Sequence, residues 1–249
     1  MLFGFIASCP LLIGSLASLF FNLSQKLVTT IMAFGSGVLI ATLTFSILIE
    51  AFTVTHSLPA SLIGLVLGGV SYAIANATLE KRSKTKRSKI NSGNDSKITS
   101  NGNSTSSKSL FIGSIMDNIP ENAALGITLA SGGAINIAFL VAIFVSNLPE
   151  GLASTNDMKS TGLSRNYILI LWSVAVAIGT ISTTIGYSVL SNASAPIISI
   201  SIAFAAGAIL VMLGESMIPE AFKTQSFGKG LALLAGFVIA VILTKVQGL

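Results

Sequence analysis

Three acidic residues and two asparagines lie in the middle of two apolar stretches of the chain. Asp117, Asn118 and Glu121 occur within residues 110–130, and Asn147 and Glu150 occur within residues 134–156. A carboxylate at the centre of a bilayer costs roughly 2.5–3.5 kcal/mol on insertion scales. The interiors of the apolar stretches contain no basic residue to pair with these acids. A bound cation, protons or water must therefore compensate them.

The spacing of these residues favours a cation. Asp117 and Glu121 are four residues apart and share one helical face, with Asn118 beside them, so their oxygens can converge on one ion. Pro120 and Pro149 lack an N–H, so each leaves one helical carbonyl without its usual partner. Unpaired backbone at membrane depth is tolerated only inside protein or beside a polar cavity. Two Asn-x-Pro-Glu motifs on neighbouring helices therefore predict a cation site.

The composition places these motifs in an all-α polytopic membrane protein. Of 249 residues, 52% are hydrophobic and 9% are charged, whereas soluble domains are about 25% charged. A helix that crosses a bilayer needs about 20 apolar residues. The apolar stretches predict eight transmembrane helices, at residues 2–22, 29–53, 59–79, 110–130, 134–156, 167–190, 195–222 and 228–247. No soluble domain remains.

The basic residues indicate the orientation of these helices. Residues 80–109, between the third and fourth helices, are rich in Ser, Asn, Lys and Arg, which predicts a disordered connection. With eight spans, thirteen of the fourteen lysines and arginines lie on one side. By the positive-inside rule this side is cytoplasmic and both termini are outside. The net charge of +5 thus reports orientation, and we expect a protein of the lipid bilayer, in the plasma (inner) membrane, with no nucleic-acid partner.

Two internal matches predict an inverted repeat. The twenty residues from Ala33 match the twenty from Ala203 at eight positions, and DNIPENAA from Asp117 resembles SNLPEGLA from Ser146. Each match joins an even-numbered to an odd-numbered span, so its two copies cross the membrane in opposite directions. Helices one to three (1–79) and six to eight (159–249) would then be inverted copies around the central pair (110–158), a symmetry typical of secondary transporters.

Other residues have weaker signals. Glu215 lies deep in the seventh span, whereas Glu50 and Glu220 lie near the ends of theirs, and these acids could form a second site or a path for the ion. Trp172 and Tyr187 lie near opposite ends of the sixth span, which predicts interfacial anchors.

The motifs resemble those of the ZIP family of divalent metal-ion transporters, which carry a His-Asn-x-Pro-Glu-Gly-like motif in the fourth span and a related Asn-x-Pro-Glu-Gly motif in the fifth. Here they read Asp-Asn-Ile-Pro-Glu-Asn from Asp117 and Asn-Leu-Pro-Glu-Gly from Asn147, with Glu-x-x-x-Pro-Glu-Ala from Glu215. The resemblance implies eight spans in a three-two-three arrangement, uptake toward the cytoplasm and a homodimer. It also implies metal ligands at Asn118, Glu121, Asn147 and Glu150.

The chain departs from the family pattern at three positions. Asp117 stands where histidine is usual, Ser146 where His or Gln is usual, and the sixth-span glutamate corresponds to Gly179. Asp117, Ser146 and Glu215 complete the candidate metal ligands. Oxygen ligands favour manganese, magnesium, calcium or ferrous iron, whereas imidazole ligands favour zinc and copper. Carboxylates can also bind zinc.

The sequence thus predicts a transporter of zinc, manganese, iron or a related divalent cation. The ion is its substrate, and we expect no permanent cofactor and no enzymatic activity. An intramembrane metalloprotease is disfavoured because the chain lacks a His-Glu-x-x-His motif. Two alternatives remain: a transporter of another cation or solute that uses buried acids, and a family member that does not transport.

Overall fold

The described part of the protein is a bundle of helices. A computed structural model describes residues 1–21, 23–55, 58–91, 99–131, 136–224 and 227–246, and the regular elements in these ranges are helical. They form eight helical rods: α1 (Leu2–Phe20), α2 with η1 and α3 (Gln25–Thr42, Leu43–Ile47 and Leu48–Thr55), α4 (Leu58–Asn91), α5 (Thr99–Ala130), α6 (Ile137–Ser160), α7 (Arg165–Leu190), α8 with η2 and α9 (Ala195–Met212, Leu213–Met217 and Ile218–Phe222), and α10 (Lys229–Val246). The all-α prediction is confirmed.

Seven of the rods are long and apolar enough to cross a membrane. They are α1, α2 to α3, the first part of α4 (Leu58–Leu79), α6, α7, α8 to α9, and α10. The eighth rod, α5, does not reach this apolarity among its described residues, because four polar side chains from Asp117 to Asn122 lie in its middle. The protein is therefore an integral, multi-pass membrane protein.

Polar side chains set the starts of three rods. Ser24, Asn136 and Ser164 each accept a hydrogen bond from a backbone N–H three residues later, which satisfies one of the unpaired donors at a helix N-terminus. Two connections contain a glycine with positive φ, Gly162 at 81° and Gly228 at 102°. These local signals separate helices that would otherwise read as continuous apolar sequence.

Two rods contain a short π-helical segment at matching places. In η1 (Leu43–Ile47) and η2 (Leu213–Met217) the backbone takes an extra residue into one turn. The two segments are separated by the same 170 residues as the first internal match. Such π segments are rare and occur often at functional sites.

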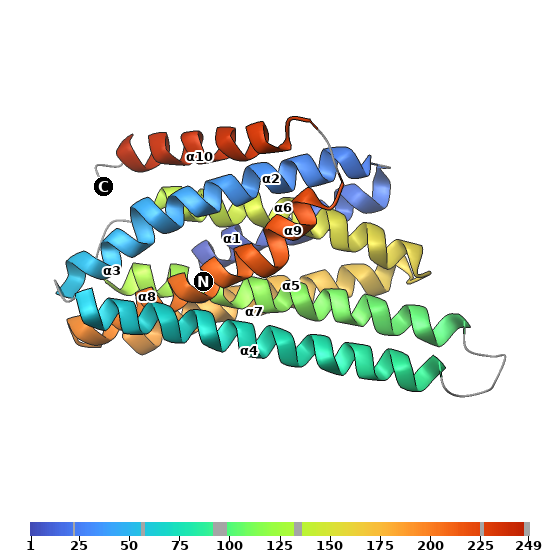
Figure 1. Ribbon diagram of the computed structural model, residues 1–249, viewed down its shortest axis with the longest axis horizontal. Helices are drawn as coiled ribbons and strands as arrows, with labels where there is room; N and C mark the ends of the chain where they lie inside the picture. The colour runs from blue at the N-terminus through green and yellow to red at the C-terminus, as the bar shows by residue number, and fades with distance from the viewer. Residues whose placement is uncertain (22, 56–57, 92–98, 132–135, 225–226, 247–249) are drawn as a thin grey trace.

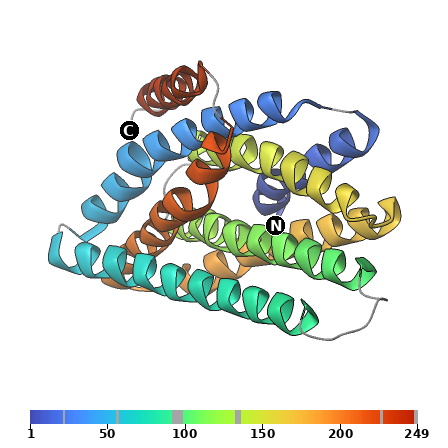
Figure 2. The ribbon, with the colours of Figure 1, turned by 45° about the vertical axis from the view of Figure 1, so that its right-hand side comes forward.

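Close backbone contacts join the rods in pairs: α1 with α6, α5 with α7, α2 with α10, and α4 with α8. A Cβ atom at Gly126 of α5 would lie 2.1 Å from the carbonyl oxygen of Thr183 in α7, and one at Gly37 of α2 would lie 1.9 Å from that of Leu233 in α10. Figures 1 and 2 show α10 lying along α2 at one edge of the bundle and α4 at the opposite edge. The pairs meet chiefly where α1 packs on α7, α2 packs on α6 and α5 packs on α8.

Two lysines cap the C-terminal ends of neighbouring helices. Lys159 donates to the carbonyl of Ser18, near the end of α1 (2.7 Å). The buried Lys229 donates to the carbonyls of Ala221 (2.8 Å) and Thr224 (2.6 Å), beside the end of α9. Each ammonium thereby satisfies carbonyls that the helix itself leaves unpaired.

Within segment 80–109, α4 continues to Asn91 and α5 begins at Thr99, and residues 92–98 lie outside the described residues. Extending an existing helix adds one hydrogen bond per residue. The disorder of this segment stays a prediction. One other expectation differs from the structure. Trp172 is not an interfacial anchor: it is fully buried, and its indole N–H donates to Thr155 Oγ1 (2.7 Å).

Candidate metal centre

Glu121 of α5 is buried and Glu150 of α6 is partly buried, and each has one buried oxygen without a partner. Glu121 of α5 is 2% exposed. Among the described residues, Glu121 Oε2 and Glu150 Oε1 are buried without a hydrogen-bond partner, and so is Asn147 Oδ1 of α6. A buried polar atom without a partner is costly and rare. Three such oxygens, contributed by the two Asn-x-Pro-Glu motifs, indicate a binding position for a group that accepts oxygen ligands.

Each asparagine of the two motifs is held by a backbone carbonyl on another helix. Asn147 Nδ2 donates to the carbonyl of Ala7 in α1 (2.9 Å), and Asn118 Nδ2 donates to that of Ala175 in α7 (2.9 Å). Since the nitrogen is engaged, the oxygen is the end of the amide that remains for an ion. In Asn147 this oxygen is unpaired, whereas Asn118 Oδ1 accepts from Asn122 Nδ2 (2.6 Å).

A hydrogen-bonded network fills the space beside Asn118. Ser8 Oγ donates to Asn122 Oδ1 (3.1 Å), which also accepts from Thr183 Oγ1 (3.2 Å). A Cβ atom at Gly179 would lie 2.1 Å from Ser8 Oγ. The position where the resemblance expects a sixth-span glutamate therefore has no room for a side chain, and the network occupies that side of the centre.

A serine on the opposite central helix lies near each glutamate, Ser146 of α6 near Glu121 and Ser114 of α5 near Glu150. The hydroxyl of Ser146 donates to the carbonyl of Ile143 (3.0 Å), and the hydroxyl of Ser114 lies 3.3 Å from that of Ser154. Asp117, Glu121 and Glu150 lie close enough for their charges to interact, and together they form a region of negative charge that attracts cations.

Asp117 differs from the glutamates because both of its carboxylate oxygens are paired. Tyr72 of α4 donates its hydroxyl hydrogen to Asp117 Oδ1, and Ser216 of η2 donates to Asp117 Oδ2 (2.8 Å). Asp117 is therefore fixed to two helices outside the central pair.

Glu215, the remaining predicted site residue, lies in η2 with its side chain exposed. Its Oε2 accepts a hydrogen bond from Asn76 Nδ2 of α4 (2.7 Å). Sequence reasoning missed Tyr72 and Asn76. The available signal was two polar residues, four apart and on one face of an otherwise apolar helix, a spacing that aligns side chains along a helix.

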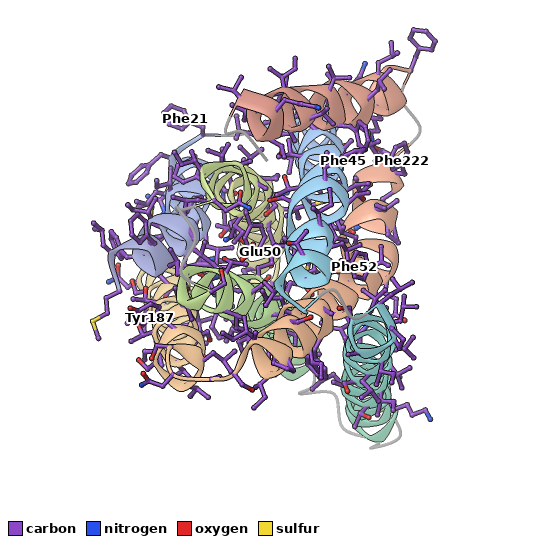
Figure 3. The ribbon with its side chains drawn as sticks, turned by 90° about the vertical axis from the view of Figure 1, so that its left-hand side faces the viewer. Phe21, Phe45, Glu50, Phe52, Tyr187 and Phe222 are labelled. Atoms are coloured by element: carbon purple, nitrogen blue, oxygen red, sulfur yellow. The ribbon has the colours of Figure 1, made fainter. Side chains whose placement is uncertain are left out.

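The two other acids make separate contacts. Ser131 Oγ donates to Glu50 Oε1 (2.6 Å), and Figure 3, which looks along the bundle, shows Glu50 on the inner side of α3 while Phe21 and Tyr187 lie at the periphery. Glu220 forms an ion pair with Lys223 at 3.3 Å on the surface. In the described part of the chain, no hydrogen bond or ion pair joins either residue to the central glutamates.

The centre offers few charged ligands. Among the described residues, no three His, Cys, Asp or Glu side chains gather closely enough to hold a metal ion by themselves. The unpaired oxygens are those of two carboxylates and one amide. Such a set suits a hard divalent cation that completes its coordination with water.

Comparison with known proteins shows a similarity to a plant protein. No protein-family model matches the chain. The chain is 29% identical over 108 residues to the Arabidopsis thaliana protein named Putative zinc transporter At3g08650. The match covers 43% of this chain and 17% of that relative. The relative's name agrees with the resemblance to metal-ion transporters that the motifs carry.

Proposed function

We propose that this protein carries divalent metal ions across a membrane through a site between α5 and α6. The observation that supports this function best is the set of three buried, unpaired oxygens on Glu121, Asn147 and Glu150. A cation bound among them would compensate both the buried charge and the missing hydrogen bonds. We assign Asp117, Asn118, Ser146 and Glu215 to the same site or to the path that leads to it.

The inverted three-two-three arrangement is part of this proposal. The two π segments, 170 residues apart, support it. So do the asparagine contacts, since Asn147 binds a carbonyl of α1 and Asn118 binds one of α7. With α5 as the eighth span, both termini lie outside, the basic segment 80–109 lies in the cytoplasm, and transport proceeds toward the cytoplasm. The homodimer and the plasma-membrane location stay predictions.

The substrate is a divalent cation that accepts oxygen ligands. Carboxylates and an amide suit manganese and ferrous iron, and two carboxylates with water also bind zinc. The name of the Arabidopsis relative supports the inclusion of zinc.

Metal uptake into proteoliposomes tests the proposal. We expect uptake of manganese, zinc or iron by the native protein, and a fall of more than about tenfold with either Glu121→Gln or Glu150→Gln, because each change removes a charged ligand. Glu220→Gln is the matched control, because its carboxylate is on the surface and paired with Lys223, and it should leave uptake unchanged. Folded, inserted protein that moves no metal would contradict transport.

A metal-binding protein that does not transport is the second candidate. The filled space beside Gly179 favours it, because that network removes one of the ligand positions that the resemblance implies. Saturable metal binding by the purified protein, together with no flux in vesicles, would identify this candidate.

A further inference from the structure

We infer that α4 forms one wall of a water-filled path for the ion, with Tyr72 and Asn76 as its lining residues. The path leads from the centre to the end of the bundle at which α4 and α5 run into segment 80–109. This inference rests on the proposed function, because it assigns the route of the ion that the centre binds. It gives α4, which carries none of the central motifs, a direct part in transport.

The acids become more exposed from the centre toward this end. Glu121 is 2% exposed, Asp117 is half-buried, and Glu215 is exposed. Glu215 nevertheless lies inside the membrane-spanning rod Ala195–Phe222. Carboxylates at membrane depth face the interior of the bundle or a water-filled cavity, because lipid cannot solvate them. The exposure of Glu215 therefore indicates that water enters the bundle as far as this residue.

Two polar side chains of α4 contact these acids. Tyr72 donates its hydroxyl hydrogen to Asp117 Oδ1, and one helical turn further on Asn76 Nδ2 donates to Glu215 Oε2 (2.7 Å). Glu150 and Glu215 also lie close enough to Tyr72 for their charges to act on its hydroxyl. The polar face of α4 thus reaches from the buried centre to the exposed acid.

These contacts leave the carboxylates able to bind a passing ion. A carboxylate oxygen that accepts one hydrogen bond keeps a further lone pair. Asp117 and Glu215 can therefore each coordinate a cation without losing their contacts to α4. Ser216, which follows Glu215 in the chain, donates to Asp117 Oδ2, so the two acids belong to one connected group.

The steps along α4 and α5 lead in the same direction. Asp117 lies four residues before Glu121 in α5, and Asn76 lies four residues after Tyr72 in α4, a rise of about 6 Å in each helix. Because α4 ends and α5 begins within segment 80–109, both steps approach this segment (Figure 1). The two helices pack on each other, and both pack on α8, which leads into η2. In the proposed topology this end is cytoplasmic.

In the described part of the chain, the side of the centre formed by α1 and α7 is filled instead. Ser8, Asn118, Asn122 and Thr183 are each at most 2% exposed and are joined by hydrogen bonds. A Cβ atom at Gly179 would lie 2.1 Å from Ser8 Oγ. An ion that left on this side would have to break the network, whereas on the α4 side each acid is followed by a more exposed one.

The test compares two cysteine variants of α4 in a Cys9→Ser background, with a charged, membrane-impermeant thiol reagent applied to permeabilised vesicles. Ile74→Cys is the matched control, because Ile74 is 63% exposed but lies two residues from Asn76, on a different face of the helix. We expect Asn76→Cys to react at least about tenfold faster than Ile74→Cys, because a charged reagent enters water but is excluded from lipid.

Asn76→Ala provides an independent measurement with manganese as the probe. Loss of the bond to Glu215 should lower the maximal rate of uptake into proteoliposomes about tenfold, the effect of one hydrogen bond to a charged group. The dissociation constant of the purified protein should stay unchanged, because the centre keeps its ligands. Asn76→Gln, which keeps the amide, should restore part of the rate. Thermal unfolding identifies variants that fail to fold.

The outcomes separate this inference from the proposed function. Equal reaction rates of the two cysteine variants would overturn the path, and so would an unchanged uptake rate of folded Asn76→Ala protein. Native protein that moves no metal would contradict transport. The comparison of the cysteine variants needs no metal, so it would still decide whether water fills the path beside α4.

Discussion

The asparagines of the two central motifs have the same chemistry but different surroundings. Both amide nitrogens donate to a carbonyl on a neighbouring helix, and both side chains are fully buried. Only Asn147 keeps an oxygen without a partner among the described residues, because Asn122 and Ser8 occupy that of Asn118. Equal motifs in the sequence therefore differ in their hydrogen bonding in the folded protein.

This inequality predicts different effects of the same substitution. Asn147→Ala and Asn118→Ala each remove one amide-to-carbonyl bond, so both should lower the stability by about 1 kcal/mol or more. Asn147→Ala alone should also weaken manganese binding by about tenfold, because it alone removes a free oxygen. Titration of the purified variants measures this, and an equal loss of binding in both would show that Asn118 is a ligand too.

At this scale the sequence predicted the candidate residues but not how their atoms are engaged. Type and spacing were sufficient to find Glu121, Asn147 and Glu150, because buried acids in apolar helices are rare and expensive. The engagement of Asp117 depends on Tyr72 and Ser216, which lie 45 and 99 residues away along the chain. No local pattern carries that information.

At the scale of elements, the helices are held together by direct contact between backbones. Gly126 of α5 lies against the carbonyl of Thr183 in α7. In a membrane, where lipid is as apolar as a leucine side chain, small residues at such crossings provide the van der Waals contact that joins helices.

The crossing of α5 and α7 predicts a contrast within one helix. Gly126→Ala would place a Cβ atom 2.1 Å from the Thr183 carbonyl oxygen, and overpacking of this kind costs about 1–3 kcal/mol. Gly113→Ala, in the same helix, meets no atom within 4 Å and should raise stability slightly, because alanine is the better helix former. Thermal unfolding in detergent compares the two; equal effects would argue against the close crossing.

The extents of the rods were largely predictable, whereas their interruptions were not. The apolar stretches of the sequence predicted helices whose first and last residues agree with the structure to within a few residues in most cases. A helix that crosses the bilayer must have this length. The π segments η1 and η2 have no composition signal of their own. Their common separation of 170 residues emerged only when the internal match was compared with the backbone.

At the scale of the whole molecule, the proposed orientation can be tested from both sides. Lys223 and Lys245 are exposed and lie near the last residues of α9 and α10. Because these helices run in opposite directions across the bilayer in the proposed topology, the two lysines lie on opposite sides.

In a Cys9→Ser background, we expect Lys245→Cys to react with a membrane-impermeant maleimide on intact cells. Lys223→Cys should react only after permeabilisation. Labelling of both from the same side would contradict the eight-span topology, and labelling of the reverse sides would contradict the orientation.

The two capping lysines change how the charge of the protein is to be understood. Lys159 and Lys229 are among the thirteen basic residues that the sequence places on the predicted cytoplasmic side. Their ammonium groups, however, are bound to carbonyls at the ends of α1 and α9. Such positions match a cation to the negative end of a helix dipole, so these two ammonium groups are bound to helix ends of the protein itself. In the proposed topology, the positive-inside signal therefore rests chiefly on the segment 80–109, which contains eight of the fourteen lysines and arginines.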